Sequence, residues 1–356
     1  MKNLKRTIIF SAFLLILTGC VFFKNESNAD TVIEKTLTLM TWNVQNLFDG
    51  KNNGFEYAEF LESSGWSQEK YLGRINSISA AIESIGVLPD FIVLQEIESL
   101  VILEDLALSL SAGFKWSCFA NNPGAALGLG VLSRIPLSQS KVHSITIDGE
   151  TVPRPVLETR IDTDDRPIVI FACHWKSKLG DEIVTENIRK SSARVILRRI
   201  RELWETEPET GIIICGDLNE NYDEYYKSGA KMICALMPDD QECAELAEHQ
   251  IDFLIISGNN PPSPVHFPYD SIIFFSPWTE ELENGSYFYK NEWETIDHFL
   301  LSAQFFNGRN WEYEMARVVN EKPFVNNNGA PFSYNARTGI GFSDHLPLLI
   351  TLRTLK

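Results

Sequence analysis

The sequence predicts an α/β protein in which two packed β-sheets are covered by helices on the outside. Many short apolar segments have the length and composition of strands, whereas only three or four segments show a clear helical pattern. Several polar motifs directly follow the apolar segments, which is where α/β scaffolds commonly carry a functional site. The length of 356 residues suits one large α/β domain or two ordinary ones.

Each expected element follows from its apolar pattern and from the residues that bound it. Strands are expected near 36–44, 91–95, 115–119, 128–133, 140–147, 155–161, 166–173, 211–215, 296–302 and 345–353, and helices near 68–85, 98–111 and 185–204. The first helix carries isoleucines on one face, and the second ends near Gly113. The strand at 211–215 is almost continuously apolar, so we expect it to be buried on both faces.

The third helix has one apolar and one basic face. Its inward residues are expected to be Ile188, Val195, Ile196, Leu203 and Trp204, and its outward residues Arg189, Lys190, Arg194, Arg198, Arg199 and Arg201. We interpret the basic face as solvated, and contact with a phosphate backbone is the alternative. Residues 220–293 are the least regular part and are rich in proline and aromatic residues. Most of these aromatics are expected to pack loops onto the core, with base stacking as the alternative.

The N-terminal segment has the pattern of an export signal. A basic start precedes an apolar run at 8–17, which is too short to span a bilayer as a helix. The run ends in a Leu-Thr-Gly-Cys sequence at Cys20 that resembles a bacterial lipoprotein cleavage box. We therefore expect a lipoprotein signal peptide at 1–19, lipidation of Cys20, a polar tether at 20–35 and a folded domain at 36–356. An ordinary signal peptide or an uncleaved anchor is the alternative.

This N-terminal pattern also predicts where the protein works. A lipidated protein would be exported and anchored to a bacterial membrane, on the periplasmic side or at the cell surface. The compartment would be oxidising, and five cysteines would remain, so at least one thiol stays unpaired or bonds to another chain. Cys173 and Cys215 are expected in the core, whereas Cys234 and Cys243 either form a disulfide or stay free. The net charge of −17 argues against a global basic field that grips nucleic acid, although local contacts remain open.

Six polar motifs at strand ends point to metal-assisted hydrolysis of phosphate esters. They are Thr41-Trp42-Asn43, Leu94-Gln95-Glu96, Cys173-His174-Trp175, Gly216-Asp217-Leu218-Asn219, Ile296-Asp297-His298 and Ser343-Asp344-His345. Mg²⁺ prefers oxygen ligands and often uses only one or two protein carboxylates. We expect Glu96, Asn43 and Asp344 to hold the metal. Asn43 could instead hold the phosphate, and Asp344 could instead serve the attacking water.

The remaining motif residues are suited to moving protons and binding phosphate. Asp217 can orient the attacking water, and Asn219, two residues further on, can bind the phosphate. A carboxylate on the far nitrogen of His345 would fix its tautomer, and Asp297 is the candidate for that carboxylate. His174 is expected across the site, where it would stabilise charge on the phosphoryl oxygens or on the leaving group.

Taken together, these segments resemble the endonuclease/exonuclease/phosphatase superfamily over about residues 37–352. In this resemblance Asn43 matches the family's first-strand asparagine, Glu96 matches its metal-binding glutamate, and Asp297 matches the aspartate that orients the final histidine. Asp217 and Asn219 match the Gly-Asp-x-Asn motif, and Asp344 and His345 match the Ser-Asp-His motif. His174 is similar to the histidine of the deoxyribonuclease branch. The resemblance implies a four-layer α/β/β/α sandwich with two mixed, mostly antiparallel sheets packed face to face. It also implies phosphoester hydrolysis by in-line water attack with Mg²⁺ or Mn²⁺ as cofactor.

Substrate and partners follow less directly. The stretch from His174 to Lys178 resembles secreted bacterial nucleases, so Lys176 and Lys178 are candidates for substrate binding. Arg134 is a further candidate, in a segment similar to the family's central strand and turn. We expect a nuclease that acts on DNA or RNA, with the membrane as a partner through the lipid anchor and no protein partner. The alternatives are a sphingomyelinase-like or inositol-phosphate phosphoesterase, and a surface-binding lipoprotein without catalysis. A sphingomyelinase would be expected to carry an apolar membrane hairpin; Ile272–Phe275 is a candidate, but we interpret it as a strand interior.

Overall fold

The computed structural model describes residues 35–354, apart from 164–165, 248–251, 264–265, 269–270, 281 and 283. The predicted signal peptide, the lipidation site Cys20 and the tether up to residue 34 lie outside the described residues. Within the described ranges, no helix combines the length and the apolar character needed to cross a membrane.

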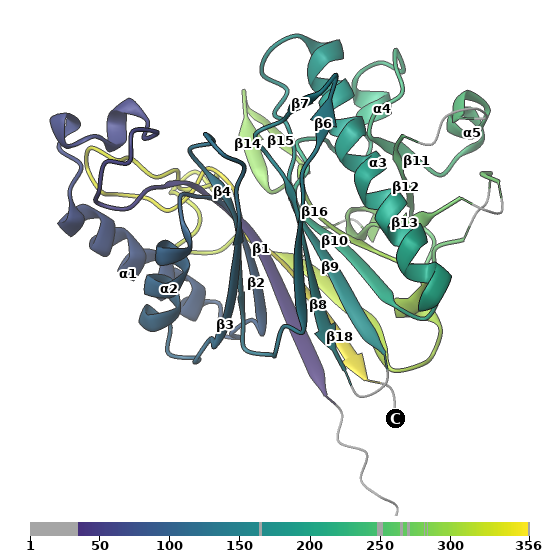
Figure 1. Cartoon of the computed structure of the whole chain (residues 1–356), viewed down its shortest axis with the longest axis horizontal. Helices are drawn as coiled ribbons and strands as arrows, with labels where there is room; N and C mark the ends of the chain where they lie inside the picture. The colour runs from purple at the N-terminus through teal and green to yellow at the C-terminus, as the bar shows by residue number, and fades with distance from the viewer. Residues whose placement is uncertain are drawn as a thin grey trace, which may run out of the picture. The chain divides into compact units, whose positions relative to one another are not determined.

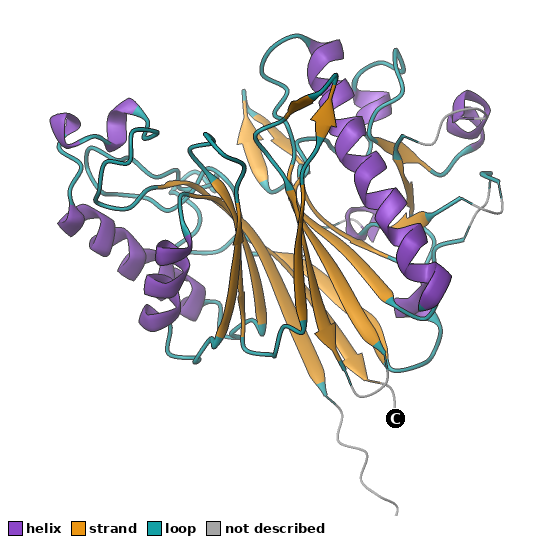
Figure 2. Cartoon of the chain, in the orientation of Figure 1, coloured by secondary structure: helices purple, strands orange, loops and turns teal. Residues whose placement is uncertain are grey.

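Two large mixed sheets form the centre of the domain (Figures 1 and 2). The strands are β1 (Thr36–Leu47), β2 (Phe91–Ile97), β3 (Trp116–Ala120), β4 (Gly128–Ser133), β5 (Gln139–His143), β6 (Thr146–Ile147), β7 (Glu150–Thr151), β8 (Val156–Asp162), β9 (Pro167–His174), β10 (Gly211–Asp217), β11 (Leu236–Pro238), β12 (Leu254–Ser257), β13 (Ile273–Phe275), β14 (Tyr287–Tyr289), β15 (Glu292–Glu294), β16 (Asp297–Leu301), β17 (Trp311–Val318) and β18 (Leu348–Thr354). The α-helices are α1 (Gln68–Ser84), α2 (Leu100–Ser109), α3 (Glu182–Thr206), α4 (Glu224–Lys227) and α5 (Gln241–Ala247), and short 3₁₀ helices span Ala58–Phe60, Glu62–Ser64, Pro277–Glu280 and Ala303–Phe306.

The strand order confirms the predicted pair of mixed, mostly antiparallel sheets. The six-stranded sheet has the order β17-β18-β1-β2-β4-β3, and the eight-stranded sheet has the order β11-β12-β13-β16-β10-β9-β8-β5. Parallel pairs are β1 with β2, β9 with β10, and the run β11-β12-β13, and the other neighbours are antiparallel. Two short hairpins, β6-β7 and β14-β15, form separate two-stranded sheets.

The sheets and helices are arranged in four layers. Helices α1 and α2 cover the outer face of the six-stranded sheet, and α3 covers the outer face of the eight-stranded sheet (Figure 1). Alternation along β10 explains why this strand is apolar throughout. Ile213 and Cys215 pack in the core that the two sheets share, whereas Ile212 and Ile214 pack in the cluster that includes α3. The four-layer α/β/β/α sandwich expected from the resemblance is thereby confirmed.

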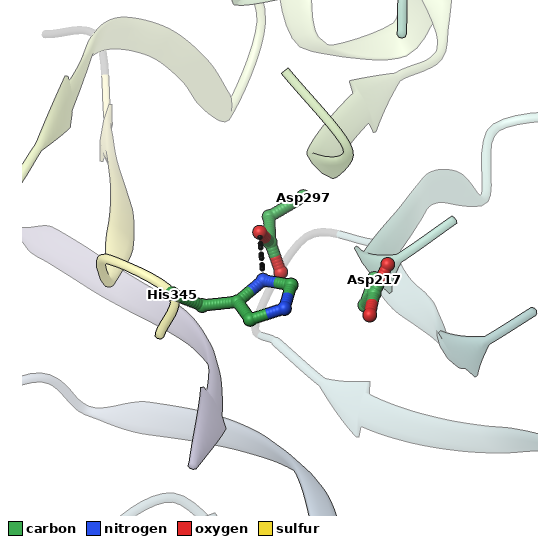
Figure 3. A group of neighbouring side chains, drawn as sticks. All are labelled: Asp217, Asp297 and His345. Atoms are coloured by element: carbon green, nitrogen blue, oxygen red, sulfur yellow. Dashed lines mark hydrogen bonds and ion pairs between the residues drawn. The ribbon is translucent and has the colours of Figure 1, made fainter. Parts of the chain in front are cut away.

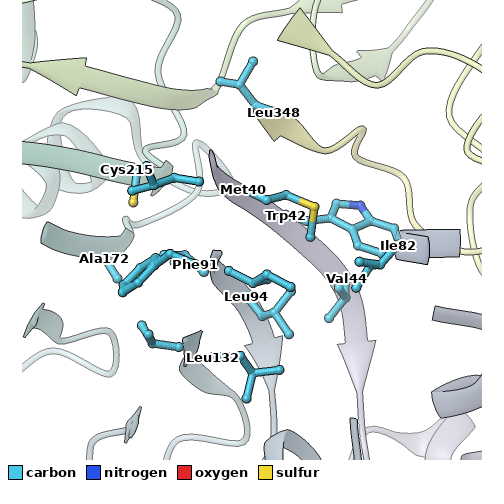
Figure 4. Packing of buried hydrophobic residues seen from close by; sticks show 14 of the residues in the cluster. Met40, Trp42, Val44, Ile82, Phe91, Leu94, Leu132, Ala172, Cys215 and Leu348 are labelled. Carbon is cyan, nitrogen blue, oxygen red and sulfur yellow. The ribbon is translucent and has the colours of Figure 1, made fainter. Parts of the chain in front are cut away.

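Side chains from both sheets meet in the central core. Met40 and Phe91 come from the six-stranded sheet, and Ala172 and Cys215 come from the eight-stranded sheet (Figure 4). All four are fully buried. This contact holds β1, β2, β9 and β10 together, and those strands carry four of the predicted site residues, Asn43, Glu96, His174 and Asp217.

Several sequence-based expectations need correction. Arg189 was expected on the outer face of the third helix but is buried, because it forms ion pairs with Glu186 and Glu220. The expected strand at 140–147 is divided into β5 and β6. Cys234 and Cys243 are both free thiols, so the disulfide alternative is not formed.

The segment at 220–293 carries more regular structure than its composition indicated. Its described residues contain two short α-helices, one 3₁₀ helix and five short strands, from α4 to β15. Within it, Ile273–Phe275 form a buried strand of the eight-stranded sheet, between β12 and β16. This apolar stretch is therefore a strand interior and not a membrane hairpin.

Candidate active site

The strand register brings the polar motifs to one edge of the sandwich. Asp217, at the end of β10, pairs with His174 at the end of β9 and with Asp297 at the start of β16. Asn43 and Glu96 lie near the ends of the parallel strands β1 and β2. Because parallel strands end at the same edge of a sheet, five far-separated motifs meet here.

Irregular backbone at the ends of β1 and β2 aims the side chains. Gln45, Asn46 and Glu96 have φ values of 52°, 56° and 65°, and the β1–β2 register shifts between Asn43 and Leu47. A bulge of this kind re-aims side chains beside functional sites. Here it allows the backbone N–H of Asn46 to donate to Oε2 of Glu96 at 2.9 Å.

Contacts between these side chains join the two sheets. The amide nitrogen of Asn43 donates to Oδ2 of Asp217 at 3.1 Å and lies 3.3 Å from Oε1 of Glu96. Nε2 of His174 lies 3.4 Å from the same Asp217 oxygen and 3.8 Å from Oε1 of Glu96. A buried amide and imidazole therefore hold two carboxylates from opposite sheets close together.

His345 forms the other half of the group. Its Nδ1 lies 2.7 Å from Oδ2 of Asp297, and Figure 3 shows the imidazole between the carboxylates of Asp297 and Asp217. One nitrogen or oxygen atom from each of these three residues lies within 4.8 Å of the others. The backbone is fixed too, because the indole N–H of Trp42 donates to the carbonyl of His345 at 3.0 Å.

Burial and neighbouring charges set the protonation states. Burial raises the pKa of Asp217 to about 7, although the nearby His345 opposes the shift. Burial by itself would lower the pKa of His345, but Asp297, through its charge and its hydrogen bond, raises it to about 10. Burial lowers the pKa of His174 well below its usual range. At neutral pH the site thus combines an imidazolium at His345, a neutral His174 and an Asp217 near its midpoint.

The excess of acidic groups fits a divalent cation. In the described part of the chain, no lysine or arginine forms an ion pair with Glu96, Asp217, Asp297 or Asp344. Asp297 is bonded to the imidazole through Oδ2 alone, and its buried Oδ1 has no hydrogen-bond partner among the described residues. Glu96 accepts from an amide side chain and a backbone N–H. Oxygen donors with uncompensated negative charge are the donor set that Mg²⁺ takes.

Two other predicted residues lie at the edge of this group. Asn219, at φ 54°, donates from its side-chain amide to the carbonyl of Trp175, and its backbone N–H donates to Oδ1 of Asp217. Asp344 is partly exposed and lines a cavity of about 690 Å³ together with Phe288 and Trp293. Its charge helps to raise the pKa of His345.

The predicted basic residues differ in position. Lys178 forms ion pairs with Glu224 at 2.6 Å and Glu294 at 3.5 Å, so it connects α4 with the β14–β15 hairpin. Lys176 donates to the carbonyl of Leu179. The structure does not bring Arg134 to the group.

Arg134 lies at the opposite edge of the six-stranded sheet. It follows Ser133, which pairs with Phe91 at the start of β2, whereas Glu96 is near the end of that strand. Its guanidinium forms an ion pair with Asp90. Because β4 runs antiparallel to β2, the residue after β4 lies beside the start of β2 and away from the site.

The sequence reasoning missed two residues that the structure adds. Arg154 donates to the carbonyl of Trp175, and its charge helps to lower the pKa of both His174 and Asp217. The signal available was a lone arginine between two prolines just before β8. Tyr287 packs on the ring of His345, with centroids 4.6 Å apart. Nothing in the sequence indicates which ring Tyr287 meets.

Comparison with solved structures places the fold among known proteins. A truncated TDP2 protein of Caenorhabditis elegans aligns with a TM-score of 0.53 at 13% identity, over 89% of this chain and 97% of that one. A functionally unknown conserved protein of Enterococcus faecalis V583 gives 0.51 at 14% identity, over 90% and 100%. TDP2 of D. rerio, complexed with a single-strand DNA product, gives 0.51 at 16% identity, over 90% and 100%. At these identities the likeness shows the fold alone.

Comparison at the level of sequence gives the family. No curated protein matches the chain. Residues 38–253, which contain Asn43, Glu96, His174 and Asp217, match the family described as the endonuclease/exonuclease/phosphatase family. With this match over more than half of its length, the chain belongs to the endonuclease/exonuclease/phosphatase family.

Proposed function

We propose that this protein is a metal-dependent phosphodiesterase that hydrolyses nucleic acid by in-line attack of water. One observation carries the proposal. Asp217 and the His345–Asp297 pair lie in one buried group beside Glu96, Asn43 and His174. The family supports the general class, because its members are metal-dependent phosphoesterases.

The cation has a defined role in this proposal. Glu96 and Asn43 would hold it, with Asp344 as a further ligand. Bound there, Mg²⁺ or Mn²⁺ supplies positive charge that neutralises the phosphoryl oxygens. The oxygen-rich donor set supports this assignment, as does the lack, among the described residues, of a lysine or arginine ion-paired with these carboxylates.

One residue of the chain accepts a proton and two stabilise charge on the phosphoryl group, while the leaving oxygen takes its proton from solvent water as the P–O bond breaks. Asp217 accepts the proton of the attacking water, since burial raises its pKa to about 7, near the working pH. His345 is an imidazolium fixed by Asp297 and donates a hydrogen bond from Nε2 to the phosphoryl oxygen. His174, neutral and buried, donates to a second phosphoryl oxygen, and Arg154 adds positive charge beside it.

Nucleic acid is the proposed substrate for two reasons. D. rerio TDP2, which has a similar fold, was solved with a single-strand DNA product. The candidate membrane hairpin of a sphingomyelinase is instead a buried strand. No observation in the described residues favours a lipid headgroup over a polynucleotide.

A panel of substrates tests this function. The full chain with Mg²⁺ should cut plasmid DNA or RNA, and EDTA should stop the reaction. Asp217→Ala should lower the rate by about 10²–10⁴, whereas Asp148→Ala, in an exposed turn, should not change it. Turnover of sphingomyelin or inositol phosphates without turnover of nucleic acid would refute the proposed substrate.

We further propose that the enzyme is exported and lipid-anchored through Cys20. The support is the sequence alone: the apolar run at 8–17 and the cleavage box that ends at Cys20. Detergent extraction followed by mass spectrometry of the N-terminal peptide should show acylated Cys20. A Cys20→Ala variant that stays membrane-bound to the same extent would contradict the anchor.

A further inference from the structure

The hairpin β14–β15 is fixed to the backbone of the catalytic loop. Tyr287 forms an isolated antiparallel bridge with His345, and the N–H of Leu346 donates to the carbonyl of Ser286 at 2.7 Å. The hairpin turn consists of Lys290 and Asn291, with φ values of 49° and 66°. Positive φ at both positions is the geometry of a tight turn that matches the twist of paired strands. The position of the hairpin relative to His345 is therefore set before any substrate binds.

Strand alternation places two tyrosines on one face of this hairpin. In the register, Phe288 pairs with Trp293, so these two side chains share one face and line the cavity beside Asp344. Tyr287 and Tyr289 share the opposite face. Their rings are stacked, with an interplanar angle of 17° and centroids 6.1 Å apart.

The stacked rings continue outward from the catalytic imidazole. Tyr287 lies 4.6 Å from the ring of His345, at an interplanar angle of 32°, and Tyr289 follows it. The ammonium of Lys290 lies 5.1 Å from the ring of Tyr289. Tyr289 is 49% exposed, and in the described residues its hydroxyl group has no hydrogen-bond partner. An exposed aromatic ring stacked in line with a catalytic histidine has no evident role in packing.

Apart from the ammonium of Lys290, the charged groups described around this face are carboxylates or an already paired lysine, which favours a ligand without dense negative charge. Glu292 and Glu294 pair with Tyr289 and Tyr287 across the hairpin and so lie on the same face. Lys178 is already held by Glu294 and Glu224. A duplex, whose backbone needs many cationic contacts, is poorly matched to this face. A flat uncharged ring is well matched, because any nucleobase can stack on an aromatic side chain.

We infer that Tyr289, stacked on Tyr287, is a platform for an unpaired nucleobase next to the scissile phosphate, so that the enzyme prefers single-stranded nucleic acid. This inference rests on the proposed nuclease function. In a duplex each base is stacked between its neighbours and offers no free face to a side chain. A single strand, or a frayed end, can place one base on Tyr289 while its phosphate reaches His345.

Variants at Tyr289 test the platform directly. Tyr289→Ala should lower kcat/KM on a single-stranded oligonucleotide by about 5- to 150-fold, mainly through KM, whereas Tyr289→Phe should retain activity. The matched control is Tyr226→Ala, which removes a ring that is 45% exposed on α4. The activity of Tyr289→Ala on a single strand of tetrahydrofuran abasic units should be unchanged, because that strand has phosphates but no bases.

Binding measurements separate this inference from the proposed activity. A labelled oligothymidylate should bind to the catalytically disabled Asp217→Asn variant, and adding Tyr289→Ala should weaken that binding by the same factor. If Tyr289→Ala weakens the binding of base-bearing and abasic strands equally, or of neither, the proposed base platform is wrong even if the enzyme is a nuclease. Loss of vesicle binding in Tyr289→Ala, with oligonucleotide binding intact, would overturn it in favour of membrane contact. If the protein cuts no nucleic acid but Tyr289→Ala still weakens oligonucleotide binding, the proposed nuclease activity is wrong and the base platform is supported.

Discussion

Replacing Asp217 with asparagine should stabilise the protein while it abolishes turnover. Asp217 is buried, with 2% of its surface exposed, and burial raises its pKa to about 7 from an ordinary value of 3.8. A carboxyl whose folded pKa lies above its unfolded pKa favours the protonated form in the fold. The free energy of unfolding therefore falls as the pH rises from about 4 to about 7. Above pH 7 the folded state carries the full cost of an ionised, buried Asp217. Asparagine cannot ionise and so avoids this cost.

The size of the effect follows from the pKa shift. The rise in the pKa of Asp217 from 3.8 to about 7 lowers the free energy of unfolding by about 4 kcal/mol at pH 8 and by about 2 kcal/mol at pH 5. The variant also loses about 1–2 kcal/mol, because its new NH₂ group would face the amide nitrogen of Asn43, which donates to Oδ2 of the native residue. The net stabilisation is thus about 2–3 kcal/mol at pH 8 and below about 1 kcal/mol at pH 5.

Urea unfolding in EDTA at both pH values measures this difference without a bound cation. Asp148→Asn is the control, because it removes one charge from an exposed turn of a chain with a net charge of −17. An Asp217→Asn variant that is no more stable than the native protein at pH 8 would refute the reasoning. So would an equal stabilisation in the control. Turnover should fall about 10²–10⁴-fold in the variant alone.

Three further variants test other parts of the site. Asp297→Asn should lower the pKa of His345 from about 10 and reduce kcat about 10²–10⁴-fold. The native ion pair stabilises the fold fully below about pH 6.5. The variant should therefore lose the most free energy of unfolding below that pH, and progressively less as the pH rises towards 10. Arg154→Met should reduce kcat/KM about 10- to 100-fold and shift the acidic limb of the pH–rate profile upward, because its charge helps to lower the pKa of Asp217; Arg134→Met, at the far edge of the sheet, should do neither. Gly216→Ala should cost about 3 kcal/mol or more in thermal unfolding, because φ is 125° and the added Cβ would lie 2.0 Å from the carbonyl oxygen of Cys173.

The fold could be predicted because local pattern and global packing agree. Strands such as β10 are apolar throughout since both faces are buried, and the helix α1 has a clear apolar face, so each pattern had one interpretation. Motifs at the ends of buried strands were also expected to converge, since a sheet brings strand ends together. The structure does bring Asn43, Glu96 and Asp217 into contact.

The missed features depend on contacts between distant segments. Arg134 and Arg154 both lie beside strands, and only the register of β4 on β2 shows that the first lies away from the site. The arginines of α3 were interpreted from helical period alone. That period does not show that Glu220, far along the chain, would accept a hydrogen bond at 2.5 Å from the buried guanidinium of Arg189. Tertiary pairing overrides the local pattern at such positions.

The burial of Arg189 also explains how the segments that follow β9 and β10 keep their relative position. Its guanidinium donates to Glu186 on its own helix, to Glu220 just after Asn219, and to the carbonyl of Lys176 just after Trp175. The two carboxylates in turn accept backbone N–H groups of residues 235 and 236, the second of them in β11. A paired charge buried this deeply is costly to break, so the segments that follow His174 and Asp217 cannot separate without leaving charged groups unpaired. The outer helix thus fixes the geometry of a site that none of its own residues enters.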